Sequence, residues 1–233
     1  MNLQKMFEMQ AELDRRIIKE KGLEGQDLLP GLILALQVEL AECANEWRGF
    51  KFWSNDQQPR REMHTTAGAT PENATHFRCE SDDCGEYLTR EDFKNLFDPD
   101  YDECPICKAG SVTVFREVDP LLEEYVDCLH FILSIGNLTK YIKNNDVNDL
   151  KRNTLEASGV NAFLELFKEI TFFNEVRKEY SLISIDPAHI MIYERIFWRF
   201  NELGKALGFT PEQIEKAYMD KNAVNHQRQQ EGY

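Results

Sequence analysis

Two segments of the chain are apolar on nearly every helical face, and both carry acidic residues within the apolar stretch. They read LILALQVELAECANEW over residues 32–47 and LLEEYVDCLHFILSIG over residues 121–136. A helix that is apolar all round belongs in a protein interior. An ionised carboxylate in such surroundings is costly unless a partner compensates its charge. Any fold of this chain therefore has to bury both helices and neutralise their acids.

The acids occur as two pairs with the same spacing. Glu39 and Glu42 are three residues apart on the first helix, and Glu124 and Asp127 repeat this spacing on the second. Each pair therefore projects from one helical face. If the two faces meet, a hard divalent cation relieves the repulsion, and Mg²⁺ prefers oxygen ligands and often bridges phosphates. The alternative is that the acids lie on exposed faces and pair with Lys or Arg, although the two apolar stretches contain few basic residues.

The remaining pattern predicts an all-α fold with a small insert. Helices are expected over 2–21, from about 30 to 47, from Asp119-Pro120 onward, and over 160–180 and 187–207. A capping box that starts at Thr210 opens a last helix, which we expect to fray in the polar tail. The predicted organisation is a helical domain of residues 1–58 and 118–233, interrupted by an inserted subdomain of residues 59–117.

Four of the six cysteines lie in the insert with metal-ligand spacing. Cys79-x4-Cys84 and Cys104-x2-Cys107 are separated by nineteen residues, an arrangement typical of a zinc ribbon. Four thiolates fill a tetrahedral shell, so we expect a structural Zn²⁺ site with no open position. The alternative is four unrelated free thiols.

Charge and hydropathy exclude several classes of protein. The net charge of −14, from 41 acidic and 27 basic residues, argues against nonspecific electrostatic binding of nucleic acid. The chain has no apolar run long enough for a membrane span and no secretory signal pattern. We expect a cytoplasmic protein that binds neither membrane nor nucleic acid.

The ordered acid motifs resemble a known family. E-x-x-E on one helix and E-x-x-D on another resemble the all-α nucleoside triphosphate pyrophosphatases of the MazG type. The surrounding ELAECANEWRGFKFW and EEYVDCLHF are similar to the dimeric dUTPases in particular. The resemblance implies a MazG-like helical bundle, a homodimer, and hydrolysis of dUTP to dUMP and pyrophosphate. It also implies that Glu39, Glu42, Glu124 and Asp127 ligate Mg²⁺ and that one of them helps orient the attacking water.

Three further segments resemble substrate-binding motifs of the same family. The tail AYMDKNAVNHQRQQEGY resembles the last motif of the family, although by itself it could be a solvated C-terminus. The segment FKFW matches a Lys-x-Trp segment, and two residues of the first helix lie where the family has its base-reading Gln and Asn. The implied substrate-binding residues are Gln10, Asp14, Lys51, Trp53, Lys221, Asn222, Asn225 and Arg228.

Two departures from the family pattern keep alternatives open. Asp14 stands where the family has an amide, and an ionised carboxylate only accepts hydrogen bonds, so dCTP or another dNTP remains an alternative substrate. The insert separates the acid pairs more widely than usual. A rival of another class is a zinc-ribbon binding module without catalysis, but the ribbon segment is strongly acidic, which disfavours nucleic acid as its partner.

Overall fold

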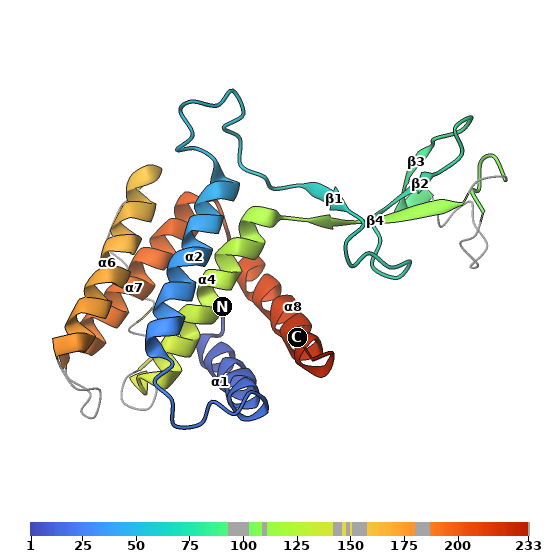
Figure 1. The fold of residues 1–233 in the computed structure, drawn as a ribbon. Coiled ribbons are helices and arrows are strands. Elements are labelled where there is room, and N and C mark those ends of the chain that lie inside the picture. Colours follow the sequence, from blue (N-terminus) through green and yellow to red (C-terminus); the bar gives the residue numbers. More distant parts are fainter. Residues whose placement is uncertain are drawn as a thin grey trace. The chain divides into compact units, whose positions relative to one another are not determined.

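The computed structural model describes residues 1–92, 103–108, 111–141, 146–147, 150, 158–179 and 187–232. The chain divides into two compact units, one of Met1–Pro59 with Leu121–Tyr233 and the other of Arg60–Pro120. The first unit is helical and the second contains the strands (Figure 1).

The helical unit contains six long helices among its described residues. They are α1 (Leu3–Glu20), α2 (Leu29–Trp47), α4 (Pro120–Leu138), α6 (Val160–Glu179), α7 (Pro187–Ala206) and α8 (Pro211–Gln230). Their bounds agree closely with the periodicity of the sequence, and the predicted all-α fold class is confirmed.

Local residues set several of the helix ends. The side chain of Asn2 accepts a hydrogen bond from the backbone N–H of Lys5 and caps α1, and Gly22 follows that helix with a φ of +64°. The hydroxyl of Thr210 accepts from the backbone N–H of Gln213 at 3.2 Å, and the Gln213 side chain accepts from the Thr210 N–H in return. This capping box begins α8 where the sequence predicts it.

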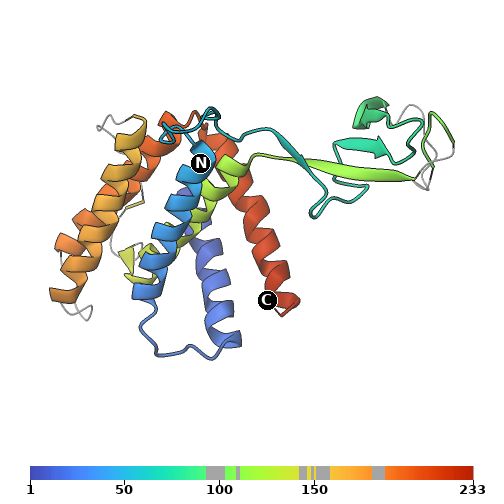
Figure 2. The same cartoon turned by 45° about the horizontal axis from the view of Figure 1, so that its top comes forward.

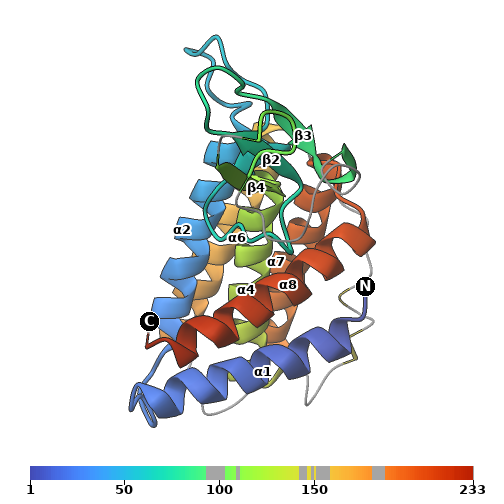
Figure 3. The same cartoon turned by 90° about the vertical axis from the view of Figure 1, so that its right-hand side faces the viewer.

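The helices share one apolar core. In Figures 1 and 2, α2, α4, α6 and α7 lie next to one another, and α6 packs against both α2 and α7. Figure 3 shows α1 and α8 side by side across α2 and α4. The buried Tyr125 of α4 stacks on Phe200 of α7 at a centroid distance of 4.1 Å, and its hydroxyl donates to the Phe200 carbonyl. Gly204 permits this contact, because a Cβ there would collide with the Tyr125 ring.

The expectation that the tail frays is wrong, because α8 continues to Gln230. A guanidinium nitrogen of Arg16 on α1 donates to the backbone carbonyl of His226 at 3.1 Å. Asn222, on the same part of α8, is buried. Packing against α1 therefore keeps the polar tail helical, which its composition alone does not predict.

The second unit is a small four-stranded sheet. Its strands are β1 (Met63–Thr65), β2 (His76–Cys79), β3 (Tyr87–Thr89) and β4 (Val112–Val118), in the antiparallel order β1-β4-β2-β3. Phe77 pairs with Leu88 on one side and with Val114 on the other, and these side chains form a small core with Ala74. In the described part of the chain, none of the helices is long and apolar enough to cross a membrane.

Candidate active site

Acids from α2 and α4 converge in the helical unit. Glu39, Glu42 and Glu124 each offer a carboxylate oxygen, and these oxygens lie within 4.8 Å of one another. Glu42 is exposed, whereas Glu39 and Glu124 are partly buried. One oxygen of Glu124 is buried and has no hydrogen-bond partner among the described residues. A group of hard oxygen donors that includes an unpartnered buried oxygen fits a cation such as Mg²⁺.

Asp127, the fourth predicted acid, is paired with a cation of the protein. The Lys221 Nζ on α8 donates to Asp127 Oδ2 at 2.6 Å, and both side chains are about four-fifths buried. Asp127 is therefore not a member of the three-acid group in the structure. It lies close enough to raise the pKa of Glu39 and Glu124.

Burial and nearby negative charges raise the pKa of Glu39, Glu124 and Asp127. Burial, followed by the charges of Asp127, Glu39 and Glu42, raises the pKa of Glu124 to about 8. Burial is also the largest cause of the raised pKa of Glu39, and it raises the pKa of Asp127 even though Lys221 opposes the shift. At neutral pH Glu124 therefore holds a proton that a bound cation would displace.

A pocket of about 580 Å³ lies between α1, the α1–α2 connection, the first turn of α2, α4 and α8. One part of its wall is polar and includes Gln10, Asp14, Ser134, Asn225 and Arg228. Another part is apolar and includes Leu13, Ile17, Leu28, Leu32 and Phe131. A largely apolar cavity with a few convergent polar groups suits a planar organic ring with hydrogen-bonding edges.

Gln10 is the centre of a buried hydrogen-bond network. Its Nε2 donates to Asp14 Oδ1 at 2.9 Å and to Ser134 Oγ at 3.0 Å. Its Oε1 lies 2.7 Å from His130 Nδ1 and accepts from the Tyr218 hydroxyl at 3.1 Å. The network therefore engages both ends of the Gln10 amide, while Asp14 Oδ1 also accepts from the Ser134 hydroxyl at 2.9 Å.

Asp14 and His130 of this network are both shifted toward their neutral forms. Burial raises the pKa of Asp14 to about 6, although hydrogen bonds from Gln10 and Ser134 oppose the shift. Burial lowers the pKa of His130 to about 3, and Lys221 adds to that effect. His130 is therefore neutral near pH 7, and it stacks on Tyr218 at a centroid distance of 4.5 Å.

The residues of the tail motif are divided between the acids and the pocket. Lys221 contacts Asp127, Asn225 and Arg228 line the pocket, and Asn222 is buried with 3% of its surface exposed. Helix α8 therefore runs from the acidic cluster to the pocket. The residues that connect the two are those of the tail motif that the family resemblance assigns to the substrate.

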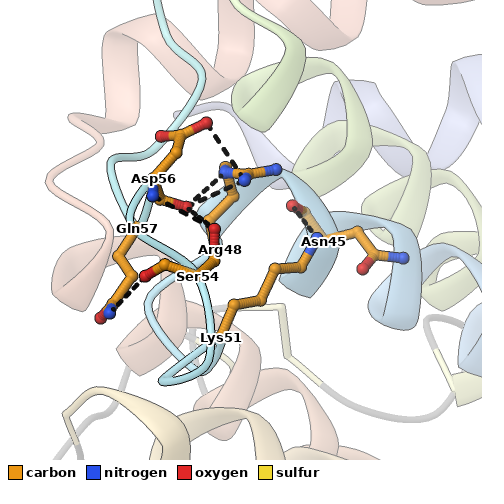
Figure 4. Close-up of polar contacts among 6 residues, drawn as sticks. All are labelled: Asn45, Arg48, Lys51, Ser54, Asp56 and Gln57. Atoms are coloured by element: carbon orange, nitrogen blue, oxygen red, sulfur yellow. Dashed lines mark hydrogen bonds and ion pairs between the residues drawn. The ribbon is translucent and has the colours of Figure 1, made fainter.

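Lys51 and Trp53 do not join these groups. They lie in the loop that follows α2. Lys51 Nζ reaches the Asn45 carbonyl at 3.5 Å (Figure 4), and Trp53 is 66% exposed. Leu32 of the pocket precedes the end of α2 at Trp47 by fifteen residues, or roughly 23 Å at 1.5 Å per residue. Along α2 the order is pocket, acids and then loop.

Two residues of the network were not singled out from the sequence. Ser134 belongs to a polar stripe at three- and four-residue spacing on the apolar helix α4, together with Asp127, His130 and Asn137. That spacing is a signal which could have identified Ser134. Tyr218 gives no comparable signal, since it is one aromatic residue in a largely polar tail helix.

The four cysteines of the second unit converge as their spacing suggests. Their sulfurs lie within 4.8 Å of one another, with 3.7 Å between Cys79 and Cys107 and 3.9 Å between Cys84 and Cys104. None of them forms a disulfide. Four sulfurs placed tetrahedrally about 2.3 Å from one Zn²⁺ are about 3.8 Å apart, so the cluster fits that ion.

Backbone groups support the same sulfurs. The N–H of Ser81 points to Cys79 Sγ, and the N–H of Ile106 points to Cys104 Sγ, each at 3.4 Å. Such donors stabilise a thiolate, which is the form that binds metal.

Comparison with known proteins identifies a family. A protein-family model described as dUTPase matches residues 2–66 and 114–233, which is most of the chain and leaves out most of the strand-containing unit. No curated protein matches the chain. No solved structure matches it either.

Proposed function

The chain belongs to the dUTPase family, and we propose on that basis that it hydrolyses dUTP to dUMP and pyrophosphate. The structural observation that carries the proposal is the convergence of Glu39, Glu42 and Glu124 beside the Lys221–Asp127 pair. The family match supports a nucleotide diphosphatase in general, and the specific substrate and Mg²⁺ are our proposal.

In this proposal the three clustered acids and Asp127 are the ligands of Mg²⁺. The bound metal would neutralise phosphate charge and supply a polarised water. The unpartnered oxygen of Glu124 is a natural ligand atom, because nothing else among the described residues satisfies it. Lys221 Nζ already donates to Asp127, and it can turn one of its other two protons toward a phosphate oxygen.

The pocket receives the base. Asp14 and Asn225 lie in its polar wall. We assign Arg228, which also lines the pocket, to the phosphate chain, where its guanidinium can bind bidentately. Gln10 holds Asp14 through the 2.9 Å hydrogen bond from its amide. Lys51 and Trp53 lie beyond the acids along α2, so we assign them to the phosphate end of the nucleotide.

The four cysteines hold a structural Zn²⁺ in an inserted subdomain, and the helical unit forms a homodimer. The sulfur spacing supports the first assignment. Exposed apolar side chains on α2 and α6, including Leu34, Val38 and Leu164, support the second. Light scattering after size-exclusion chromatography measures the dimer directly, and a monomer at micromolar concentration would contradict it.

The substrate is tested by measuring pyrophosphate release from each dNTP with Mg²⁺. We expect dUTP to give the highest kcat/KM and the signal to disappear when the metal is chelated. A protein that is folded and metal-loaded but hydrolyses no dNTP would refute the proposal and favour a binding module.

One observation favours a second candidate, dCTP. Asp14 accepts hydrogen bonds when it is ionised, and the 4-amino group of cytosine donates whereas the O4 of uracil accepts. The pKa of Asp14 is raised to about 6, and the protonated form of Asp14 can donate to O4 of uracil instead. Comparing dUTP with dCTP in the same assay decides between them.

A further inference from the structure

The loop of residues 48–57 contains a buried charged residue to which the proposed function gives no role. Arg48 ends α2 in the left-handed backbone region, with φ 62° and ψ −14°, and is 9% exposed. That conformation is disfavoured for a residue with a side chain and persists where surrounding contacts hold it. The next residue is glycine, and a Cβ there would collide with the ring of Trp47.

The Arg48 side chain closes the loop. Its Nε and Nη2 donate to the backbone carbonyl of Asp56 at 3.1 and 2.9 Å, and Nη2 also lies 3.1 Å from the Asp56 carboxylate (Figure 4). The Ser54 hydroxyl donates to the same carbonyl and accepts from the Asp56 N–H, each at 3.1 Å. Gln57 donates to the Ser54 carbonyl at 3.0 Å. These contacts form a clasp that joins the end of α2 to the end of the loop.

The loop that the clasp closes carries aromatic side chains that are exposed and therefore not fixed by burial in a core. Phe52 is 85% exposed and Trp53 is 66% exposed. The described ring contacts of Trp53 are edge-on contacts with Phe50 and Phe52, at centroid distances of 5.7 and 5.0 Å, and both belong to the same loop. The orientation of Trp53 therefore depends on the backbone course of the loop, which also carries Lys51.

We propose that Arg48 is a positioning residue, whose clasp on Asp56 holds Lys51 and Trp53 ready to bind the nucleotide. This inference rests on the proposed function for the role of those two residues. A loop that is already ordered loses less conformational entropy when a ligand binds, so the clasp strengthens substrate binding more than it alters the chemical step.

Three substitutions distinguish the role of Arg48 in the clasp from its role in ending α2. Arg48→Ala removes the guanidinium, and Arg48→Lys keeps a charge without the planar fork. Arg48→Gly removes the guanidinium but suits the left-handed backbone. If Arg48 serves only to end the helix, Gly restores wild-type behaviour. We expect instead that Ala and Gly both raise the KM for dUTP about tenfold with kcat within about twofold, and that Lys lies between them and wild type.

A second measurement does not depend on activity. In protein labelled with 5-fluorotryptophan, the Trp53 ¹⁹F resonance is identified by its loss in Trp53→Phe. We expect Arg48→Gly to shift and narrow this resonance as the loop becomes mobile. The matched control is Arg199→Ala, which removes an arginine of similar exposure (17%, against 11% for the Arg48 side chain) that joins α7 to α6 through Glu165. It should change neither the Trp53 resonance nor the KM.

An unchanged Trp53 resonance and KM in folded Arg48→Gly would overturn the inference. If wild-type protein does not hydrolyse dUTP, the proposed function fails, and the Trp53 resonance still decides whether Arg48 orders the loop.

Discussion

Glu42 and Asp127 illustrate how differently two of the proposed metal ligands are placed. Glu42 is exposed on α2, whereas Asp127 is mostly buried and bonded to Lys221. In our proposal both become metal ligands, so removing the charge of either should weaken metal binding while the shape of the side chain is kept. At the scale of single residues, the charge of the carboxylate is the property to test.

We expect Glu42→Gln and Asp127→Asn each to lower turnover by at least about a hundredfold at saturating Mg²⁺, since each removes a charged ligand. The assay is pyrophosphate release, with circular dichroism to confirm folding. Glu123→Gln is the matched control, because it neutralises the acid next to Glu124 without touching the cluster. Turnover near the wild-type value in either test variant would disprove the four-carboxylate site.

Asp14 should make base preference depend on pH. Its pKa of about 6 means that it is mostly protonated at pH 5 and mostly ionised above pH 7. The protonated form can donate to O4 of uracil, and the ionised form accepts from the amino group of cytosine. We therefore expect the ratio of kcat/KM for dUTP to that for dCTP to fall as the pH rises from 5.5 to 7.5.

The ratio removes effects that the two substrates share, such as ionisation of the triphosphate and binding of the metal. Asp14→Asn is the control, because its amide does not titrate, and its ratio should be constant over the same range. A wild-type ratio that is equally constant would show that Asp14 does not face the base.

At the scale of elements, α8 brings together groups that the other helices keep apart. Lys221 reaches the acids, while Asn225 and Arg228 reach the pocket. Asn222 is buried between them, so the upstream part of the helix also belongs to the core. The last turns can therefore be removed separately from the part that supports the fold.

Truncation after Asn225 should keep a folded protein and lower kcat/KM by at least about a hundredfold, because a lost charged phosphate contact typically costs about 3 kcal/mol. Steady-state kinetics measures the effect, and a thermal melt checks the fold. Arg228→Ala in the full chain should reproduce most of the loss. If the truncated protein is as active as the full chain, the tail motif has no role in the reaction.

At the scale of the whole molecule, the two units rest on different sources of stability. The helical unit has a large apolar core that includes Tyr125 and Phe200, whereas the apolar core of the strand unit is centred on Ala74 and Phe77. Folding free energy for so small a core is commonly supplied by a metal. The four cysteines of that unit are the groups that would bind it.

We expect one tightly bound zinc per chain, lost when Cys104 and Cys107 are both replaced by Ser. Elemental analysis measures the metal, and NMR amide dispersion shows whether the strand unit unfolds while the helical unit persists. Cys43→Ala, outside the cluster, should retain the zinc. Wild-type protein without zinc after growth in zinc-containing medium would contradict the assignment.

The sequence by itself determined the helices, the acid pairs and the cysteine pairs. Helical periodicity, capping residues such as Thr210 and the spacing of Cys104 and Cys107 act over a few neighbouring residues, so they can be read locally. The family resemblance, which the match over residues 2–66 and 114–233 confirms, came from the same local motifs.

Only the tertiary structure decided which groups meet. Lys221 pairs with Asp127 across 94 residues, and Gln10 reaches Ser134 across 124. The same packing leaves Lys51 and Trp53 outside the pocket and keeps the polar tail helical. These outcomes depend on how helices distant in sequence pack around a shared core, and helical spacing along one segment carries no information about its partner in space.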